Sequence, residues 1–258
     1  MTNILPFPQE RKHTLFFLRY VRAFSPVFID TDVDMSKILS LREQSLQTTQ
    51  VKYSIIAYFI HAAARVMANY PEANSSLAAG LIPKIARHNN VNAKFTLDKN
   101  IGEQRTVLSA LVTDADKMSL QGIQNIIEYY KNNDFEEIAE FSSLKMLHKL
   151  PLFIGQSLFS WIVSKLSKRK SLFGTFSVTS LGHKPINSFF SVGGTTLTFG
   201  IGQIQPRAIV KNLQIKSAPI MRLSMTFDHR TIDGAMAADI LYDIKEKLEN
   251  FNESNCTI

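Results

Sequence analysis

The sequence predicts a mixed α/β (α+β) fold, in which helices pack on one largely mixed sheet. The chain has 258 residues, 45% of them hydrophobic and 20% charged, which is enough for one substantial core and too short for several enzymatic domains. Segments with a period of two and segments with helical spacing both occur. Most strand candidates follow one another without a helix between them, so a doubly wound parallel sheet is disfavoured.

The first expected elements are a strand and two helices. Residues 27–34 alternate apolar and polar side chains, as a half-buried strand does, and residues 35–42 repeat apolar positions at helical spacing. Ser54 is a typical N-cap for a second helix, which Pro71 stops. A run of alanines in this helix indicates close packing against a neighbour.

The remaining elements complete the mixed pattern. Residues 91–97 and 106–113 are expected to be strands, because they flank the turn-forming residues 98–102. Gly200 and Gly202 lack the third glycine of a dinucleotide loop and are interpreted as the end of a strand. The other expected elements are a helix over residues 119–130, strands over 174–179, 195–202 and 220–227, and an amphipathic helix over 235–248.

Charge and composition narrow the function classes. Lys and Arg exceed Asp and Glu by 29 − 22 = 7, which favours anionic partners; nucleic acid is not among the partners we expect. The most apolar stretch, residues 150–163, is interrupted by Pro151 and Gly155 and is shorter than the roughly 20 residues that span a bilayer. The start of the chain lacks a secretory leader pattern, so we expect a cytoplasmic protein. The single cysteine, Cys256, is expected to be a tail thiol.

The segment with the clearest chemistry runs from Asp228 to Gly234, with the sequence Asp-His-Arg-Thr-Ile-Asp-Gly. It lies where an expected strand ends and a helix begins, so a rigid scaffold presents His229, and histidine is the side chain most often used as a general base near neutral pH. Asp233 can fix the local geometry by pairing with an arginine, and Gly234 permits a tight backbone. From these residues alone, an ordinary strand-end turn with a satisfied histidine remains equally open.

The whole string, with its strand and helix context, resembles the catalytic signature of the dihydrolipoyl acyltransferases of 2-oxo-acid dehydrogenase complexes, whose fold chloramphenicol acetyltransferase shares. The resemblance continues upstream through Gly-Thr-Phe-Ser-Val-Thr-Ser-Leu-Gly at residues 174–182, through residues 114–120 and 71–74, and at Arg11-Lys12. It covers nearly the whole chain in order, apart from about residues 134–171. It implies a chloramphenicol-acetyltransferase-like sheet flanked by helices, in a single catalytic domain over residues 1–258.

The resemblance assigns a role to each matched residue. His229 is expected to accept the proton of the attacking nucleophile, with its other ring nitrogen bonded to its own backbone carbonyl. Asp233 is expected to be structural and paired with Arg11, while Arg19 and Arg22 remain open. Thr179 occupies the place of the hydroxyl residue that stabilises the oxyanion. Asp228, Arg230 and Gly234 complete the motif.

The resemblance also implies how such a protein works. We expect an acyltransferase that moves an acyl group from a pantetheine thioester, carried by coenzyme A or an acyl carrier protein, to a thiol, hydroxyl or amine. It needs no permanent cofactor and no metal. We expect a homotrimer in which Thr179 and His229 of one site come from different chains. The chain leaves no room for a lipoyl domain and is expected to stand alone. The alternative is a non-catalytic scaffold or carrier-binding subunit that retains the fold.

The segment around residues 134–171 departs from the family and is expected to be a helical insertion. It combines broad apolar faces with basic side chains and, between Lys145 and Lys170, contains no Asp or Glu. A helical hairpin that covers its own domain is one interpretation. The other is a docking surface for an acidic carrier protein or an anionic membrane face, formed by Lys165, Lys168, Arg169 and Lys170.

Overall fold

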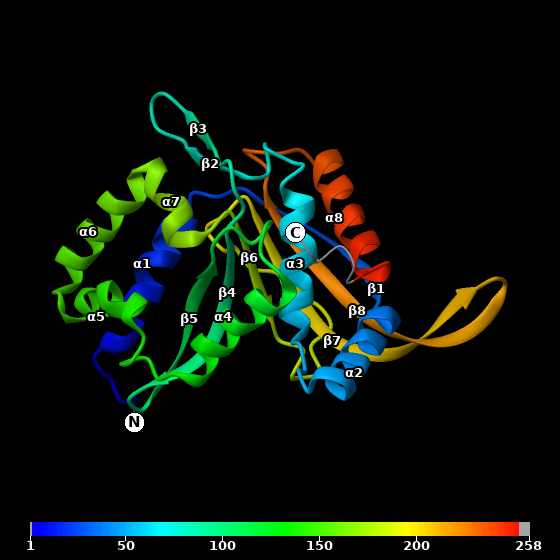
Figure 1. The fold of residues 1–258 in the computed structure, drawn as a ribbon. Helices are drawn as coiled ribbons and strands as arrows, with labels where there is room; N and C mark the ends of the chain where they lie inside the picture. The colour runs from blue at the N-terminus through cyan, green and yellow to red at the C-terminus, as the bar shows by residue number, and fades with distance from the viewer. Residues whose placement is uncertain (1, 253–258) are drawn as a thin grey trace.

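The computed structural model describes residues 2–252, and it contains a six-stranded mixed sheet with helices on both sides (Figure 1). The strand order is β1-β8-β7-β6-β4-β5. The pairs β4–β6 and β6–β7 are parallel, and the other neighbouring pairs are antiparallel. This arrangement confirms the predicted fold class. The strands are β1 (Pro26–Asp34), β2 (Ser75–Ala78), β3 (Lys84–Arg87), β4 (Ala93–Ile101), β5 (Gln104–Val112), β6 (Phe176–Ser180), β7 (Leu197–Lys211) and β8 (Gln214–Asp228).

The helices fall into two groups. In the first, α3 and α8 pack on each other, with α4 beside α3 and α2 beside α8; in the second, α1 packs against α5 and α6. The bounds are η1 (Gln9–Arg11), α1 (Lys12–Val21), α2 (Ser36–Thr49), α3 (Ile55–Met67), α4 (Leu120–Asn132), η2 (Ala139–Phe141), α5 (Ser142–Lys149), α6 (Leu152–Ser164), α7 (Leu166–Phe173) and α8 (Gly234–Glu249). Within residues 2–252 no helix is long and apolar enough to cross a membrane.

The two faces of the sheet differ in chemistry because neighbouring residues of a strand point to opposite sides. Phe95, Val178, Phe199 and Met225 are buried in the main core, which α3 and α8 also line. The residues one position away along the strands are polar: Lys94, Ser177, Thr198 and Thr226 stand opposite one another across four strands. The sheet therefore carries a row of polar side chains on the face away from that core.

The chain crosses this polar face between β6 and β7. A Cβ atom at Gly200 would lie 1.8 Å from the carbonyl oxygen of Phe189, and one at Gly202 would lie 2.1 Å from that of Asn187. The interpretation of these glycines as the end of a strand is wrong, because β7 continues to Lys211 past a bulge between Ile201 and Ile204. The glycines instead let the 187–189 backbone pass directly over the strand.

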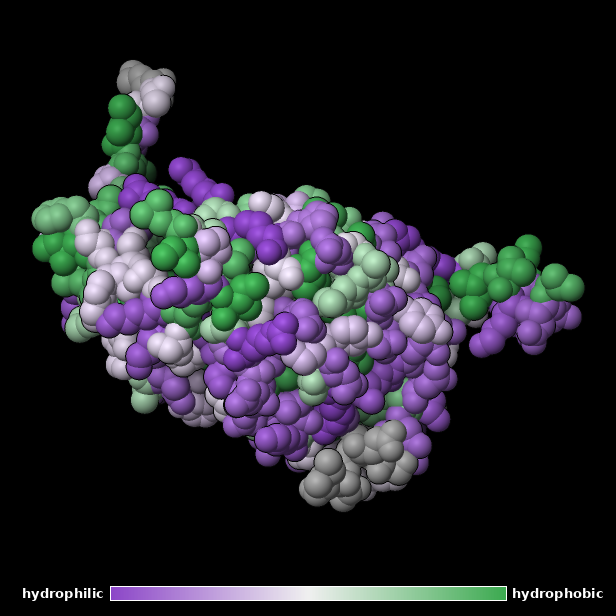
Figure 2. All heavy atoms as spheres, turned by 90° about the horizontal axis from the view of Figure 1, so that it is seen from above, coloured by the Kyte–Doolittle hydropathy of each residue, from purple (hydrophilic) through white to green (hydrophobic). Residues whose placement is uncertain are grey.

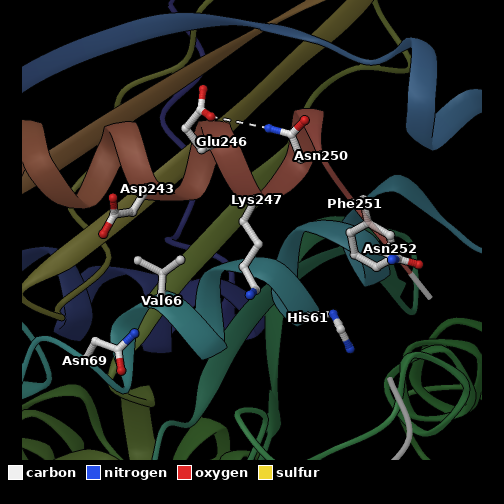
Figure 3. A pocket seen from close by; sticks show the side chains of 9 residues that line it. All are labelled: His61, Val66, Asn69, Asp243, Glu246, Lys247, Asn250, Phe251 and Asn252. Atoms are coloured by element: carbon white, nitrogen blue, oxygen red, sulfur yellow. Dashed lines mark hydrogen bonds between the residues drawn. The ribbon is translucent and has the colours of Figure 1, made fainter. Parts of the chain in front are cut away.

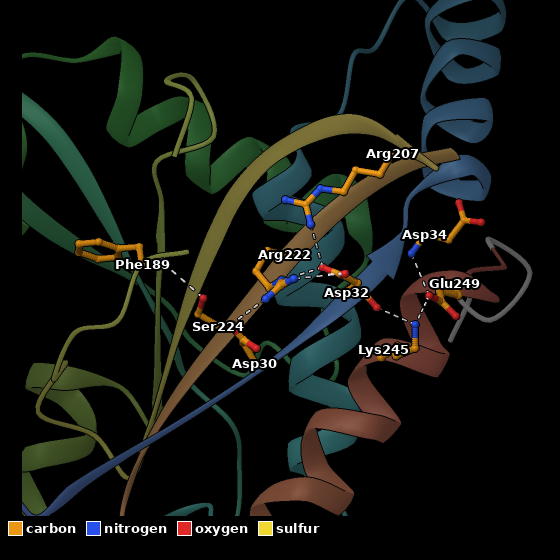
Figure 4. Close-up of polar contacts among 9 residues, drawn as sticks. All are labelled: Asp30, Asp32, Asp34, Phe189, Arg207, Arg222, Ser224, Lys245 and Glu249. Atoms are coloured by element: carbon orange, nitrogen blue, oxygen red, sulfur yellow. Dashed lines mark hydrogen bonds and ion pairs between the residues drawn. The ribbon is translucent and has the colours of Figure 1, made fainter. Parts of the chain in front are cut away.

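Strands β7 and β8 extend beyond the body as a long hairpin, seen on the right of Figure 1. The sequence predicted only their inner halves. Near the sheet, Arg222 donates to Asp32 and Asp30, and Arg207 pairs with Asp32 (Figure 4). Lys245 of α8 donates to the backbone oxygen of Asp32 on the same edge. These contacts tie β1, β7, β8 and α8 together at the base of the hairpin.

The segment predicted as a helical hairpin contains three α-helices, α5, α6 and α7, after the short 3-10 helix η2. Lys12 of α1 donates to the backbone oxygens of His148 and Leu150, and His13 of α1 and His148 share a hydrogen bond of 2.9 Å. Burial, with the neighbouring His13 as a smaller cause, lowers the pKa of His148 to about 4, so this histidine is neutral at pH 7. The segment is thus fixed to α1 by polar contacts.

Candidate active site

His229 follows directly after β8, at the start of the turn that leads into α8. Its backbone N–H donates to the carbonyl of Ser25 at 2.9 Å, and its side chain is 47% exposed. The turn is closed by hydrogen bonds from the backbone N–H groups of Thr231 and Ile232 to the carbonyl of Asp228. The backbone is therefore held on both sides of a ring that remains open to solvent.

Asp228 and Arg230 form an ion pair that stabilises this turn. Asp228 is 4% exposed and accepts two hydrogen bonds from the guanidinium of Arg230, at 2.8 and 2.5 Å, and one from the backbone N–H of Ser25 at 3.3 Å. These bonds raise the pKa of Arg230 above its ordinary value. The ring of Phe24 lies 4.9 Å from the same guanidinium. The two charged motif residues are therefore paired with each other.

Asp233 occupies a different place from the one predicted. Its Oδ1 lies 3.4 Å from Nδ1 of His229, and its side chain is 88% exposed. The predicted ion pair with Arg11 is absent within residues 2–252, because η1, which contains Arg11, packs against β5 at the opposite edge of the sheet from β1. Arg19, one of the two other candidates beside Arg22, donates to Gln156. The sequence analysis predicted that this ring nitrogen is bonded to the backbone carbonyl of His229 itself. In the structure Nδ1 instead faces the carboxylate of Asp233.

Gly234 begins α8 without an evident need for glycine. A Cβ atom there would meet open space within this chain, and its backbone is outside the left-handed region. The predicted tight backbone at this position is therefore wrong for the single chain.

Thr179 lies in the middle of the sheet, far from His229 of the same chain. It stands opposite Gly200 on β7, and Gly200 stands opposite Ser224 on β8. Ser224 precedes His229 by 229 − 224 = 5 residues, or about 17 Å along a strand. One chain does not bring the two side chains to the same reacting atom. Thr179 accepts a hydrogen bond of 3.1 Å from the hydroxyl of Thr96.

Lys94 is a buried cation on the polar sheet face, and the sequence analysis missed it. Its ammonium donates to the carbonyl of Gly193 and lies 5.0 Å and 5.3 Å from the ring centroids of Phe17 and Phe173. Burial lowers the pKa of Lys94 to about 7. The only sequence signal was a lysine at a position inside an otherwise buried strand.

Replacing Lys94 with methionine is expected to stabilise the fold by about 1–4 kcal/mol near pH 7, because a buried charge without a carboxylate is replaced by an apolar chain of similar length. In the unfolded chain a lysine has a pKa of about 10.4, well above the value of about 7 in the folded protein. Between pH 7 and 10 the unfolded chain therefore binds more protons, and parent stability rises with pH. Melting curves at both pH values should show a weaker pH dependence for Lys94→Met. The exposed Lys37→Met is the control; a Lys94 variant less stable than the parent at both pH values contradicts this account.

Of the four cations predicted to form a docking surface, two are engaged in hydrogen bonds within the chain. Arg169 is 9% exposed and donates to the backbone oxygens of Val163 and Leu77, and Lys170 donates to Asn90. These two are corrected to structural cations that fasten α7, since their donors are used inside the chain. Lys168 is exposed, and Lys165 lies 3.4 Å from the ring centroid of Trp161, itself 59% exposed. Hydrophobic side chains gather at the left of the face shown in Figure 2.

A cavity of about 430 Å³ lies away from His229, at the other end of α8 (Figure 3). It is lined by residues of α3 and α8 and those that follow α8, including His61, Lys247 and Phe251. Burial lowers the pKa of His61 to about 3. This cavity contains none of the motif residues. Among residues 2–252 no group of three or more His, Cys, Asp or Glu side chains is placed to hold a metal ion. Cys256 is outside the described residues.

Solved structures with a similar fold include the cores of two multienzyme complexes. The cubic core of the pyruvate dehydrogenase multienzyme complex matches with a TM-score of 0.73 at 19% identity, covering 97% of this chain and 92% of that chain. A truncated catalytic core of the 2-oxoacid dehydrogenase multienzyme complex from Thermoplasma acidophilum matches with a TM-score of 0.68 at 18% identity, covering 97% and 100%.

Curated relatives agree with this fold. The dihydrolipoyllysine-residue acetyltransferase component of the pyruvate dehydrogenase complex of Rickettsia typhi is 26% identical over 229 residues, covering 86% of this chain and 48% of the relative. The succinyltransferase component of the 2-oxoglutarate dehydrogenase complex of Buchnera aphidicola is 26% identical over 232 residues, covering 86% and 46%. The chain spans about half the length of the curated relatives it matches.

The family model described as 2-oxoacid dehydrogenases acyltransferase (catalytic domain) matches residues 18–139 and 164–255. The unmatched residues 140–163 fall within the segment predicted as an insertion. Both motif blocks, around Thr179 and around His229, lie inside the matched ranges. The resemblance seen in the sequence is confirmed: the chain belongs to the family of 2-oxoacid dehydrogenase acyltransferase catalytic domains.

Proposed function

We propose that this protein transfers an acyl group between a coenzyme A thioester and a thiol, with His229 as the general base. Family membership supports acyl transfer over a non-catalytic scaffold. The observation that carries the mechanism is the geometry at the end of β8. The backbone of His229 is fixed by Ser25, its Nδ1 faces Asp233, and half of its side chain is open to a substrate.

The chemistry follows from the ring nitrogens. In this proposal the Asp233 carboxylate, whose Oδ1 lies 3.4 Å from Nδ1, favours the tautomer with the proton on Nδ1, so Nε2 carries the lone pair that serves as the base. Nε2 takes the proton of the attacking thiol, and the thiolate attacks the thioester carbonyl. The resulting oxyanion is stabilised by a hydroxyl donor, and collapse of the tetrahedral intermediate expels the coenzyme A thiolate, which recovers the proton from His229.

The oxyanion donor comes from a second chain in this proposal. Thr179 is the hydroxyl at the family position, and the register places it about 17 Å along the strand from His229 of its own chain. A cyclic trimer brings β6 of one chain to the β8 end of the next and makes three equal sites. The cubic core among the solved relatives is an assembled particle, which supports such self-association.

Donor and acceptor are tested directly. Acetyl- and succinyl-coenzyme A are incubated with dihydrolipoamide, and release of coenzyme A and formation of the acyl-lipoamide are followed by chromatography. Consumption of the thioester with matching product supports the proposal. An acyl carrier protein that holds the acyl group on its pantetheine arm is the second donor to test. Lys165 and Lys168 remain exposed and could contact such an acidic carrier. We keep residues 134–171, to which both lysines belong, as an insertion in a single domain. No product from any donor, with an intact trimer, favours the scaffold alternative.

Asp233→Asn is expected to slow transfer by about tenfold or more, because a neutral amide does not balance the charge of the imidazolium as the carboxylate 3.4 Å from Nδ1 does. The melting temperature should stay near that of the parent, since an 88% exposed side chain contributes little to stability. Asp239→Asn, at an exposed position in α8, is the control. A variant that transfers at the parent rate refutes this role, whereas a large loss of stability points to an arginine partner such as Arg11 from a neighbouring chain.

A further inference from the structure

The hydrogen bond between Thr96 and Thr179 joins two parallel neighbouring strands. The last paired residues of β4 and β6 are Phe95 and Val178, so the two threonines come next on each strand. Their side chains point to the polar face of the sheet, on the side of Lys94 and Ser177. Thr96 is the donor and Thr179 the acceptor, with 3.1 Å between the two oxygens.

The direction of this hydrogen bond decides whether the hydroxyl proton of Thr179 is available for donation. A hydroxyl has one proton and two acceptor lone pairs. Because Thr179 accepts from Thr96, its own proton remains free for another acceptor. A hydroxyl that already accepts a hydrogen bond is also polarised and becomes a better donor. The bond therefore prepares Thr179 to donate, where a bond in the opposite direction would use up its proton.

We propose that Thr96 is a positioning residue that holds the Thr179 hydroxyl as a donor to the oxyanion. This rests on the proposed function, in which Thr179 stabilises the tetrahedral intermediate. Both residues are β-branched and stand on strands, so their side-chain torsions are restricted and the pair needs little reorganisation during the reaction. Thr96 itself does not touch the substrate.

Thr96→Val keeps the shape of the side chain and removes the donor. We expect kcat to fall by about 3- to 10-fold, the effect of one neutral hydrogen bond, with KM for the thioester unchanged because the charge develops only in the transition state. Thr96→Ser restores the hydroxyl and should recover the rate. Thr106→Val is the matched control: Thr106 is buried in β5, and its hydroxyl has no hydrogen-bond partner in the described part of the chain.

A double-mutant cycle separates positioning from plain structure. In Thr179→Ala there is no hydroxyl to position, so adding Thr96→Val should cause no further loss of kcat. Thr96→Val at the parent rate while Thr179→Ala is slow overturns the inference and leaves the proposed function intact. A Thr96→Val loss that is equally large in the Thr179→Ala background also overturns it. If Thr179→Ala is as fast as the parent, the oxyanion role fails, and this inference fails with it.

Discussion

Replacing His229 with alanine is expected to lower kcat by about 10²- to 10⁴-fold, the usual contribution of a general base, and to abolish nearly all transfer. The fold should survive, because the side chain is 47% exposed and the bond to Ser25 uses the backbone N–H, which alanine keeps. The measurement is steady-state transfer from acyl-coenzyme A, with melting and size-exclusion chromatography of the same sample.

His183→Ala is the control for this experiment, since His183 is exposed and lies outside the motif. It should transfer at the parent rate. If His229→Ala keeps the parent rate while remaining assembled, the base is elsewhere and the mechanism is wrong. Loss of assembly in His229→Ala would instead show that the ring contributes to the contact between chains.

Thr179→Ala is expected to reduce kcat by about 10²- to 10³-fold, which is the cost of removing one oxyanion donor. The donor is needed only when the carbonyl oxygen becomes negative, so KM for the thioester should change little. Thr179→Ser keeps the hydroxyl and should restore most of the rate. An alanine variant as active as the parent rules out Thr179 as the donor.

The end of β8 was predictable because strand, turn and helix signals follow one another directly. An alternating strand ends at Asp228, and apolar residues with helical spacing begin after Gly234. Family resemblance then supplied the role of His229. Neither the local pattern nor the resemblance predicts which residue Asp233 contacts, because that depends on how distant segments of the chain are placed. Arg11 lies at the far edge of the sheet.

The sequence missed elements whose local signals conflict with their structure. The outer part of the β7–β8 hairpin pairs Pro206 with Pro219, and prolines are read as strand breakers because they donate no ladder hydrogen bond. Helix α1 was missed because its N-cap residue, Arg11, makes no side-chain hydrogen bond to the first turn and is not one of the usual capping residues. Arg169 and Lys170 looked like surface charges because the sequence does not show which carbonyl or amide oxygens surround a cation.

The proposed sharing of one active site between two chains is tested most directly by mixing two variants that are each expected to be inactive, His229→Ala and Thr179→Ala, so that chains exchange at random within the proposed trimer. If each site takes His229 from one chain and Thr179 from its neighbour, one site in about four regains both groups, because each is intact with a probability of one half. The account predicts about a quarter of the parent rate from a 1:1 mixture that is unfolded and reassembled, and no gain when the variants are assembled separately. A mixture no more active than the average of the two separate variants would contradict a site built from two chains.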